Sequence, residues 1–323
     1  MELLGALEGT DGDEHPLTRA DAEALLAIDA RGPEMYRLLA LSNGWSRRRF
    51  GERGYVFAQI GVNAEPCPVD CGFCSMGASH YAMDSTWRKD AAALRPEIER
   101  LLEEGIDDLF LMTTADFPQD RFVAMIAEIR PLLPPGVRLV ANIGDFSRET
   151  AHALRDAGCT GAYHIRRLGE GEDTLAAPEA RERTLEAVRD AGLELYYCIE
   201  PIGPEHGRDE LAREMVRARD LGVRAMAAMR RIPVPGTPLF GRGRISALEL
   251  TKIVAVANLV VRPARSMNVH EPTPMALLAG VNQLYAEVGA NPRDTSSRTE
   301  RGRGFTPARA WELLAEGGWF PGA

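Results

Sequence analysis

The chain has 323 residues, of which 45% are hydrophobic, and a formal net charge of −9 at pH 7. This length and apolar content suit one large core, such as that of a single α/β barrel. The negative charge excludes the basic surface of a general nucleic-acid-binding protein. No apolar run reaches the length of a membrane span and the first residues are acidic, so we expect no membrane contact and a cytoplasmic setting.

The first fifty residues predict two helices. Thr18 precedes a run of apolar residues at helical spacing, and Asp21 lies three residues after Thr18. This is the pattern of an N-terminal helix cap. A second helix is expected from about Pro33 to Arg49, ending before Gly51. We interpret residues 1–52 as a helical extension and residues 53–323 as the catalytic domain.

From Tyr55 onward, apolar strand-like runs alternate with helical stretches. This alternation predicts a parallel sheet, and eight units predict its closure into a (β/α)8 TIM-type barrel, an α/β fold. An open partial barrel of six units, with the last two strands as an appendage, is the alternative. The expected strands are Tyr55–Val62, Asp108–Thr114, Arg138–Gly144, Gly161–Arg166, Glu194–Pro201, Arg224–Met229, Arg265–His270 and Gln283–Val288, each followed by a helical stretch.

The most specific motif is the run Cys67-Pro68-Val69-Asp70-Cys71-Gly72-Phe73-Cys74, which we call the cluster loop. Three thiolates at this spacing can ligate three irons of a [4Fe–4S] cluster and leave the fourth iron open. A structural zinc site needs a fourth ligand, for which His80 is the candidate. The cluster loop directly follows the first strand, at the barrel end where active sites lie, so its position favours a catalytic cluster.

The cysteine spacing, with Phe73 before the third cysteine, resembles the signature of the radical S-adenosylmethionine (radical SAM) enzymes. In that family SAM chelates the open iron, and an electron splits SAM to give a 5′-deoxyadenosyl radical. The resemblance is closest to the biotin synthase-like branch, which includes methylornithine synthase and hydrogenase-cofactor maturases. The segments that carry it are Glu186–Gly192, Pro235–Leu239 and Met275–Asn282.

The resemblance implies a [4Fe–4S] cluster and SAM as cofactors. Cys67, Cys71 and Cys74 match the cluster ligands, while Arg181 matches an arginine that holds the SAM carboxylate, a task that suits a guanidinium. A solvated helix arginine is the alternative for Arg181. The residues expected to bind the cofactor are Phe73, Thr113, Thr114, Asn142, Arg166, Arg181 and Glu200.

The chain departs from biotin synthase at the second iron–sulfur cluster of that enzyme, which is held by three further cysteines on inner strand positions. The positions that align with them hold Leu111 or Met112, Val140 and Tyr196. The spare thiols are Cys159, expected to be buried packing, and Cys198 on the fifth strand. Sulfur insertion by the biotin synthase route is therefore disfavoured.

We expect a radical SAM enzyme that abstracts hydrogen from a small molecule in cofactor or metabolite biosynthesis, with a flavodoxin- or ferredoxin-type electron donor. Basic residues at the strand ends favour an anionic substrate. The alternatives are biotin synthase-type sulfur insertion into dethiobiotin and a non-enzymatic iron–sulfur protein with a structural or electron-transfer cluster. The candidate catalytic residues are His164, Tyr196, Cys198 and His270.

Overall fold

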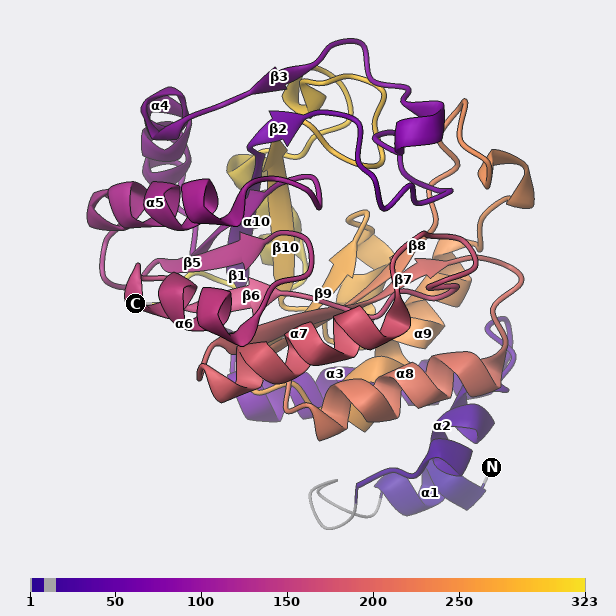
Figure 1. Ribbon diagram of the computed structural model, residues 1–323. Coiled ribbons are helices and arrows are strands. Elements are labelled where there is room, and N and C mark those ends of the chain that lie inside the picture. The colour runs from indigo at the N-terminus through magenta and orange to yellow at the C-terminus, as the bar shows by residue number, and fades with distance from the viewer. Residues whose placement is uncertain (1, 9–15, 323) are drawn as a thin grey trace.

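The computed structural model describes residues 2–8 and 16–322, and eight parallel strands form a closed barrel at its centre (Figure 1). The barrel closes because β1 pairs with both β4 and β10. This confirms the predicted (β/α)8 barrel and excludes the open six-unit alternative. The barrel strands are β1 (Tyr55–Gly61), β4 (Asp108–Met112), β5 (Arg138–Asn142), β6 (Gly161–Tyr163), β7 (Glu194–Ile202), β8 (Ala225–Arg230), β9 (Ser266–His270) and β10 (Gln283–Val288).

Helices surround the barrel in the alternating order that the sequence predicts. They are α4 (Ala91–Glu103), α5 (Gln119–Ile129), α6 (Arg148–Asp156), α7 (Pro178–Asp190), α8 (Arg208–Asp220), α9 (Ala247–Val261) and α10 (Pro307–Glu316). Short 3-10 helices add η1 (Ala78–His80), η2 (Arg130–Leu132), η3 (Phe240–Arg242), η4 (Pro274–Ala279) and η5 (Thr299–Arg301). A small antiparallel pair, β2 (Asn63–Ala64) and β3 (Trp87–Arg88), lies in the connection between β1 and α4.

One connection differs from the prediction of a full helix after each strand. Between β9 and β10 the chain forms only η4 (Pro274–Ala279), which is followed by Gly280 in the left-handed conformation. η4 packs against α3 and α9.

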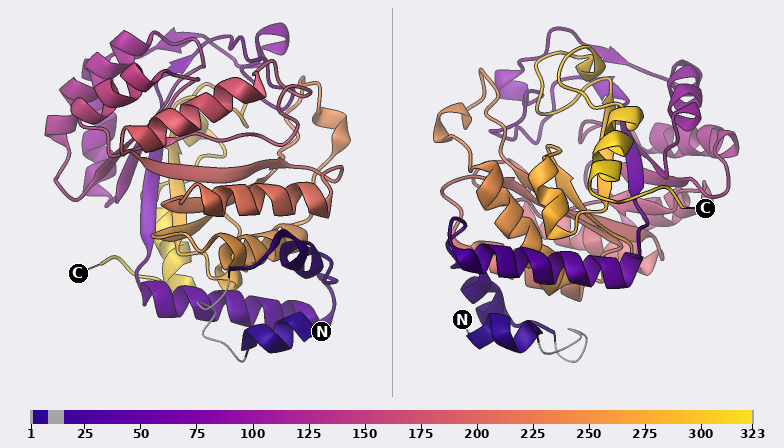
Figure 2. Two further views of the ribbon diagram at one scale, coloured as in Figure 1. Left: turned by 60° about the horizontal axis from the view of Figure 1, so that its bottom comes forward. Right: turned by 180° about the vertical axis from the view of Figure 1, so that it is seen from behind.

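The N-terminal helices are α1 (Glu2–Glu8), α2 (Arg19–Leu26) and α3 (Pro33–Phe50). Thr18 and Asp21 form the predicted capping box at the start of α2. Figure 2 shows α3 lying on the outside of the barrel, where it packs against α9 and η4. Asn258 of α9 donates to the hydroxyls of Ser42 and Ser46 of α3, and this buried contact fastens α3 to the outer layer of helices.

The apolar side chains of the N-terminal helices belong to the same core as the barrel. Leu25, Met35 and Leu38 are all buried within it. The predicted domain boundary between residues 52 and 53 remains a prediction. Among the helices of the described residues, none combines the length and apolar character needed to cross a membrane.

The barrel interior is filled from its floor upward. At the floor, the buried carboxylate of Asp108 accepts hydrogen bonds from Arg265 (2.6 Å) and Gln283 (2.8 Å). Above it lies an aromatic layer in which Phe57 contacts Phe110 and Tyr285, with ring centroids 4.4 and 5.4 Å away. The interior therefore opens only near the C-terminal ends of the strands.

Candidate active site

A chamber opens at the C-terminal end of the barrel. Its walls are strand ends and the loops that follow them. The structure brings the following predicted site residues together around it: Cys67, Cys71, Cys74, Phe73, Thr113, Thr114, Asn142, His164, Arg181, Glu200 and His270. Three predicted residues do not line it, namely Arg166, Tyr196 and Cys198.

Two neighbouring loops hold the cluster loop in place. The amide of Gly72 donates to the carbonyl of Asp173 (2.8 Å), and the amide of Leu239 donates to the carbonyl of Gly72 (2.8 Å). Asp173 follows β6 and Leu239 follows β8, so both contacts come from the far side of the mouth. The cluster loop is thus part of the barrel rim.

The thiols receive backbone hydrogen bonds of the kind that iron–sulfur sites use. The amide of Met76 points at Sγ of Cys74 (3.3 Å), and the amide of Ala115 points at Sγ of Cys67 (3.5 Å). Such contacts stabilise a thiolate and tune the potential of a cluster bound to it. Burial acts in the opposite direction and raises the pKa of Cys71 to about 11, so metal binding would displace the thiol protons.

The arrangement does not suit a zinc ion. Within the described residues, the three loop thiols are not among the groups whose ligand atoms lie within 4.8 Å of one another. His80, the candidate fourth ligand, directs Nε2 at the carbonyls of Cys71 (3.2 Å) and Cys74 (3.0 Å) instead. His80 therefore braces the cluster loop, and the spread of the thiols fits a polynuclear cluster better than a single ion.

The segment after β4 forms the wall next to the cluster loop, which the amide of Ala115 contacts. Asn63 holds it by accepting from the amide of Thr114 (2.9 Å) and donating to its hydroxyl (2.8 Å). The amide of Thr113 donates to the carbonyl of Asn142, whose side chain donates to Gln59 (3.0 Å). Both threonines are buried, so their positions are set by these contacts.

A Gly144→Ala substitution should disturb this wall. A Cβ at Gly144 would lie 2.3 Å from the carbonyl oxygen of Ala115 and 2.7 Å from its Cα, so the backbone after β4 would have to move. We expect a loss of about 1–3 kcal/mol in the free energy of unfolding and weaker SAM binding. Urea denaturation and equilibrium dialysis measure the two effects. Gly136→Ala is the control, because nothing lies within 4 Å of its Cβ position; equal effects of both substitutions would contradict this reasoning.

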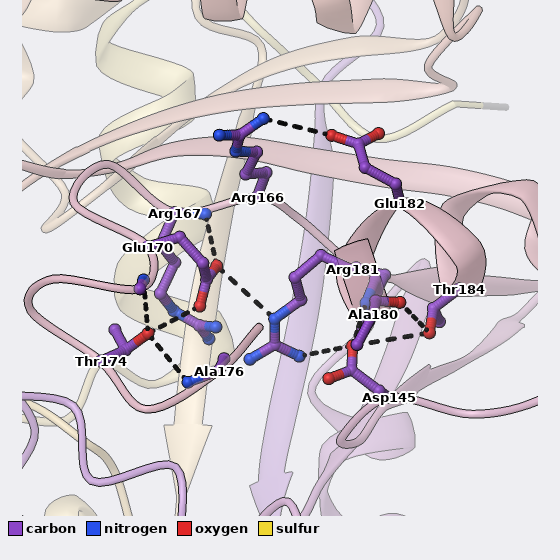
Figure 3. Close-up of polar contacts among 12 residues, drawn as sticks. Asp145, Arg166, Arg167, Glu170, Thr174, Ala176, Ala180, Arg181, Glu182 and Thr184 are labelled. Carbon is purple, nitrogen blue, oxygen red and sulfur yellow. Dashed lines mark hydrogen bonds and ion pairs between the residues drawn. The ribbon is translucent and has the colours of Figure 1, made fainter. Parts of the chain in front are cut away.

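Arg181 lies between two carboxylates, as Figure 3 shows. Its Nη1 donates to Asp145 (3.0 Å) and its Nε is 3.5 Å from Oε2 of Glu170. Asp145 also contacts Nε2 of His164 (3.1 Å). Burial raises the pKa of Asp145, but His164 and Arg181 outweigh it and the net shift is downward.

Arg181 is buried at the wall of the chamber. Its side chain is 4% exposed, and its Nε faces Glu170 in an ion pair that is too long or too poorly aligned to be a hydrogen bond. The guanidinium is therefore held inside the protein by carboxylates on both sides. This observation argues against the solvated arginine that was the alternative for this position.

Two adjacent arginines follow β6, and only the second, Arg167, lines the chamber. Arg166 turns outward to Glu182 (3.5 Å), as Figure 3 shows. The Nε of Arg167 lies 3.5 Å from Oε1 of Glu200 and, within the described residues, has no hydrogen-bond acceptor. Arg167 is therefore the residue that faces the site, and a contact of Arg166 with the cofactor is not supported by its orientation.

The inner part of the chamber carries buried charge. Glu200 accepts a hydrogen bond from the hydroxyl of Tyr163 (3.0 Å). On the facing wall, Arg293 pairs with Glu287 and lies 3.3 Å from Glu271. Burial raises the pKa of Glu287. Arg293 follows β10, and nothing in the sequence pattern indicated that this loop folds back into the barrel.

The remaining candidates for catalysis lie at different depths. Tyr196 sits at the floor, where its hydroxyl contacts Asp108 (3.3 Å), so it is far from the strand ends. Cys198 is fully buried one layer higher, and its Sγ is 3.9 Å from Nδ1 of His270. Burial, together with the charge of Arg293, lowers the pKa of His270 to about 3. His270 is therefore neutral near pH 7.

Another arginine at the barrel rim, Arg231, forms an ion pair with a glutamate. Arg231, after β8, is 1% exposed and pairs with Glu205, after β7. Burial opposes the shift, but hydrogen bonds from Arg231 outweigh it and lower the pKa of Glu205 to about 2. Arg231 is thus not free to bind an anionic substrate.

This pair predicts a pH dependence. Because the folded carboxyl stays ionised down to about pH 2 while the unfolded one takes a proton near 4.5, the pair stabilises fully above pH 4.5 and its contribution is lost as the pH falls towards 2. Glu205→Gln should flatten the dependence of the unfolding free energy on pH in that window, as measured by urea denaturation. Glu312→Gln, which alters an exposed pair with Arg309, should leave the slope as in wild type; equal slopes for all three proteins would contradict the assignment.

Comparisons with known proteins agree with this geometry. The biotin synthase of Desulforudis audaxviator (strain MP104C) is 28% identical over 295 residues, covering 85% of this chain and 86% of that protein. The crystal structure of methylornithine synthase superposes with a TM-score of 0.82 at 17% identity, covering 98% of this chain and 97% of that one. The FeFe-hydrogenase maturase HydG from Carboxydothermus hydrogenoformans gives 0.83 at 18% identity, covering 99% and 78%. No protein-family model matches the chain.

The sequence similarity to biotin synthases supports the resemblance to the biotin synthase-like branch of the radical SAM enzymes, and the solved structures share the barrel fold. The chain is an enzyme, and the non-enzymatic alternative is set aside. Enzymes of this family act on small molecules and use SAM, an iron–sulfur cluster and an external electron donor.

This radical SAM enzyme lacks thiols at the inner positions that hold the second cluster of biotin synthase. Met112 lines the chamber, so Leu111 points to the other face of β4. Val140 pairs in register with Phe110, which faces the interior, and Tyr196 lies at the floor. Cys159 is buried at the end of α6, outside the chamber. None of the three positions therefore carries a cysteine thiol that could ligate a second cluster.

Proposed function

We propose that this enzyme binds a [4Fe–4S] cluster through Cys67, Cys71 and Cys74 and uses it to cleave SAM reductively. The observation that supports this most is that three thiols from one loop share a chamber with Arg181 and with the threonines after β4. The bound cluster and SAM supply a 5′-deoxyadenosyl radical that abstracts hydrogen from a small-molecule substrate.

The chain's own residues would orient SAM. Arg181, which is buried and lines the chamber, would bind the carboxylate of SAM through its guanidinium. Thr113 and Thr114, on the chamber wall next to the cluster loop, would bind the amino group of SAM, and Phe73, 8% exposed, would pack beside the adenine. The surrounding side chains exclude water, which protects a reactive radical from solvent.

The chamber supports a polar substrate for this reaction. Glu200, Glu287 and Arg293 contribute buried charge of both signs to its wall. Charged groups that are buried need charged or hydrogen-bonding partners. We infer a substrate with ionisable groups, including an anionic one that Arg293 or Arg167 would bind, and a flavodoxin- or ferredoxin-type protein as the electron donor.

Sulfur insertion into dethiobiotin is the second candidate, because the biotin synthase of Desulforudis audaxviator is 28% identical to this chain. The absence of thiols at Met112, Val140 and Tyr196 disfavours it. Incubation of the reconstituted enzyme with dethiobiotin, SAM and reductant should form no biotin. Formation of biotin would overturn our preference.

The proposed function is tested by anaerobic reconstitution with iron and sulfide, reduction, addition of SAM, and detection of 5′-deoxyadenosine by mass spectrometry. We expect a cluster that contains four irons per chain and releases 5′-deoxyadenosine. Deuterium transfer from candidate substrates into that product then identifies the substrate. A fully loaded and reduced enzyme that neither binds SAM nor changes its paramagnetic resonance signal upon SAM addition would contradict the proposal.

A further inference from the structure

Three potential metal ligands meet beside the chamber and have no part in the proposed cluster site. They are Cys198 and Glu200, which share one face of β7, and His270, at the end of β9. Within the described residues, theirs is the group of three such side chains whose ligand atoms all lie within 4.8 Å of one another. All three side chains are buried.

The register of the barrel places β7 and β9 on either side of β8 here. Cys198 pairs with Ala227 of β8, and Met229 of β8 pairs with His270. Ala227 has only a methyl side chain beside Cys198. Side chains of the two flanking strands come close to each other, with 3.9 Å between Sγ of Cys198 and Nδ1 of His270.

The distances are close to those of a mononuclear metal site. Sγ of Cys198 lies 3.9 Å from Nδ1 of His270, which lies 4.0 Å from Oε2 of Glu200. Metal–ligand bonds of about 2.0–2.3 Å with tetrahedral angles place ligand atoms roughly 3.3–3.6 Å apart. Side-chain movements of about 1 Å or less would close the three atoms on an ion.

Neighbouring groups already orient the carboxylate. The hydroxyl of Tyr163 donates to Oε2 of Glu200 (3.0 Å), and Arg167 lies beside Oε1. Contacts of this kind to a ligating carboxylate are the usual support of a metal site.

We propose that Cys198, Glu200 and His270 bind one Zn²⁺ ion at the inner wall of the chamber. Thiolate, imidazole and carboxylate together are ligands that zinc favours, and three protein ligands leave the fourth position open, as in catalytic zinc sites. Glu200 and His270 both line the chamber, so the open position faces the space that the cluster loop also faces. The ion would bind a carboxylate, amine or hydroxyl of the substrate and hold it in place for hydrogen abstraction.

Metal binding by these residues is independent of the radical reaction, whereas the role of the ion in holding the substrate rests on the proposed function. Zinc binding gives Glu200 a role different from the contact to SAM that the family resemblance implies. Its test therefore measures metal and SAM binding separately.

The experiment uses the full-length enzyme with its cluster fully reconstituted, so that iron occupies the loop thiols. After exposure to Zn²⁺ and removal of loosely bound metal, zinc is counted by inductively coupled plasma mass spectrometry. Co²⁺ is then used in place of Zn²⁺, since a thiolate-to-cobalt charge-transfer band reports a cysteine ligand. We expect one zinc per chain and a clear band.

Variants assign the ligands. Cys198→Ser should abolish the band, and Cys198→Ser, Glu200→Gln and His270→Gln should each weaken zinc binding by at least about tenfold. Cys159→Ser, which alters another buried thiol, should keep both signals. Circular dichroism confirms folding, and a Cys67→Ala/Cys71→Ala/Cys74→Ala variant should retain the single zinc. Folded wild-type enzyme without zinc, a band that persists in Cys198→Ser, or zinc lost with the loop cysteines would overturn the proposal, and each result is independent of 5′-deoxyadenosine formation.

Discussion

A Cys74→Ala variant is expected to form no 5′-deoxyadenosine above background when it is supplied with iron, sulfide, SAM and a one-electron reductant. The cluster loop offers three thiols, and removal of one leaves two iron positions without a protein ligand. Cys74 is also the thiol that accepts a hydrogen bond from the amide of Met76, so both the ligand and its support are lost. Iron content, absorption spectra and mass spectrometry of the product measure the effect.

Cys159→Ala is the matched control for this prediction. Burial raises the pKa of both thiols, but Cys159 lies at the end of α6 and outside the chamber. The control should bind the cluster and form the product as wild type does. Wild-type activity in Cys74→Ala would show that the cluster loop is not the site of SAM cleavage.

An Arg265→Leu variant is expected to lose about 3–5 kcal/mol of unfolding free energy, because it leaves an uncompensated carboxylate in the barrel floor. Asp108 is 0% exposed and the side chain of Arg265 is 5% exposed. Although the charge of Arg265 opposes it, burial already raises the pKa of Asp108. The guanidinium also stacks over Tyr55, with 4.0 Å between Cζ and the ring centroid, and this contact would be lost as well.

Urea denaturation of the cluster-free proteins measures this cost. Arg309→Leu removes a partner from an exposed pair and should change the free energy of unfolding by less than about 1 kcal/mol. The double variant Asp108→Leu/Arg265→Leu should recover part of the loss, since it leaves no charge behind. Equal effects of Arg265→Leu and Arg309→Leu would contradict the structural role of the floor pair.

The barrel could be predicted from sequence because strands buried on both faces are nearly continuous apolar runs, and eight of them alternate with helical stretches. The cluster loop was placed correctly for the same reason, as it directly follows the first run. The hydrophobic periodicity of the sequence alone could not predict that a 3-10 helix, η4, precedes β10. This segment packs against α3, and that contact is not visible in the sequence.

The site was less predictable, because the depth of a side chain in the barrel and the direction in which it points depend on how the strands pair. β6 ends at Tyr163, so strand alternation cannot tell which of Arg166 and Arg167 faces inward. Tyr196 shares a face with Glu200, yet the pairing of Tyr196 with Ala225 sets it at the floor. Arg293 reaches the chamber from a loop, and a single sequence carries no periodic signal for such a contact.

The closed floor has a kinetic consequence. The Asp108 layer fills the barrel below the chamber, so the chamber opens near the C-terminal ends of the strands, where the cluster loop lies. A substrate bound at His270 and Glu287, on strands β9 and β10, would have to pass the proposed SAM site at the cluster loop. We therefore expect the substrate to bind before SAM and to leave after the products of SAM cleavage.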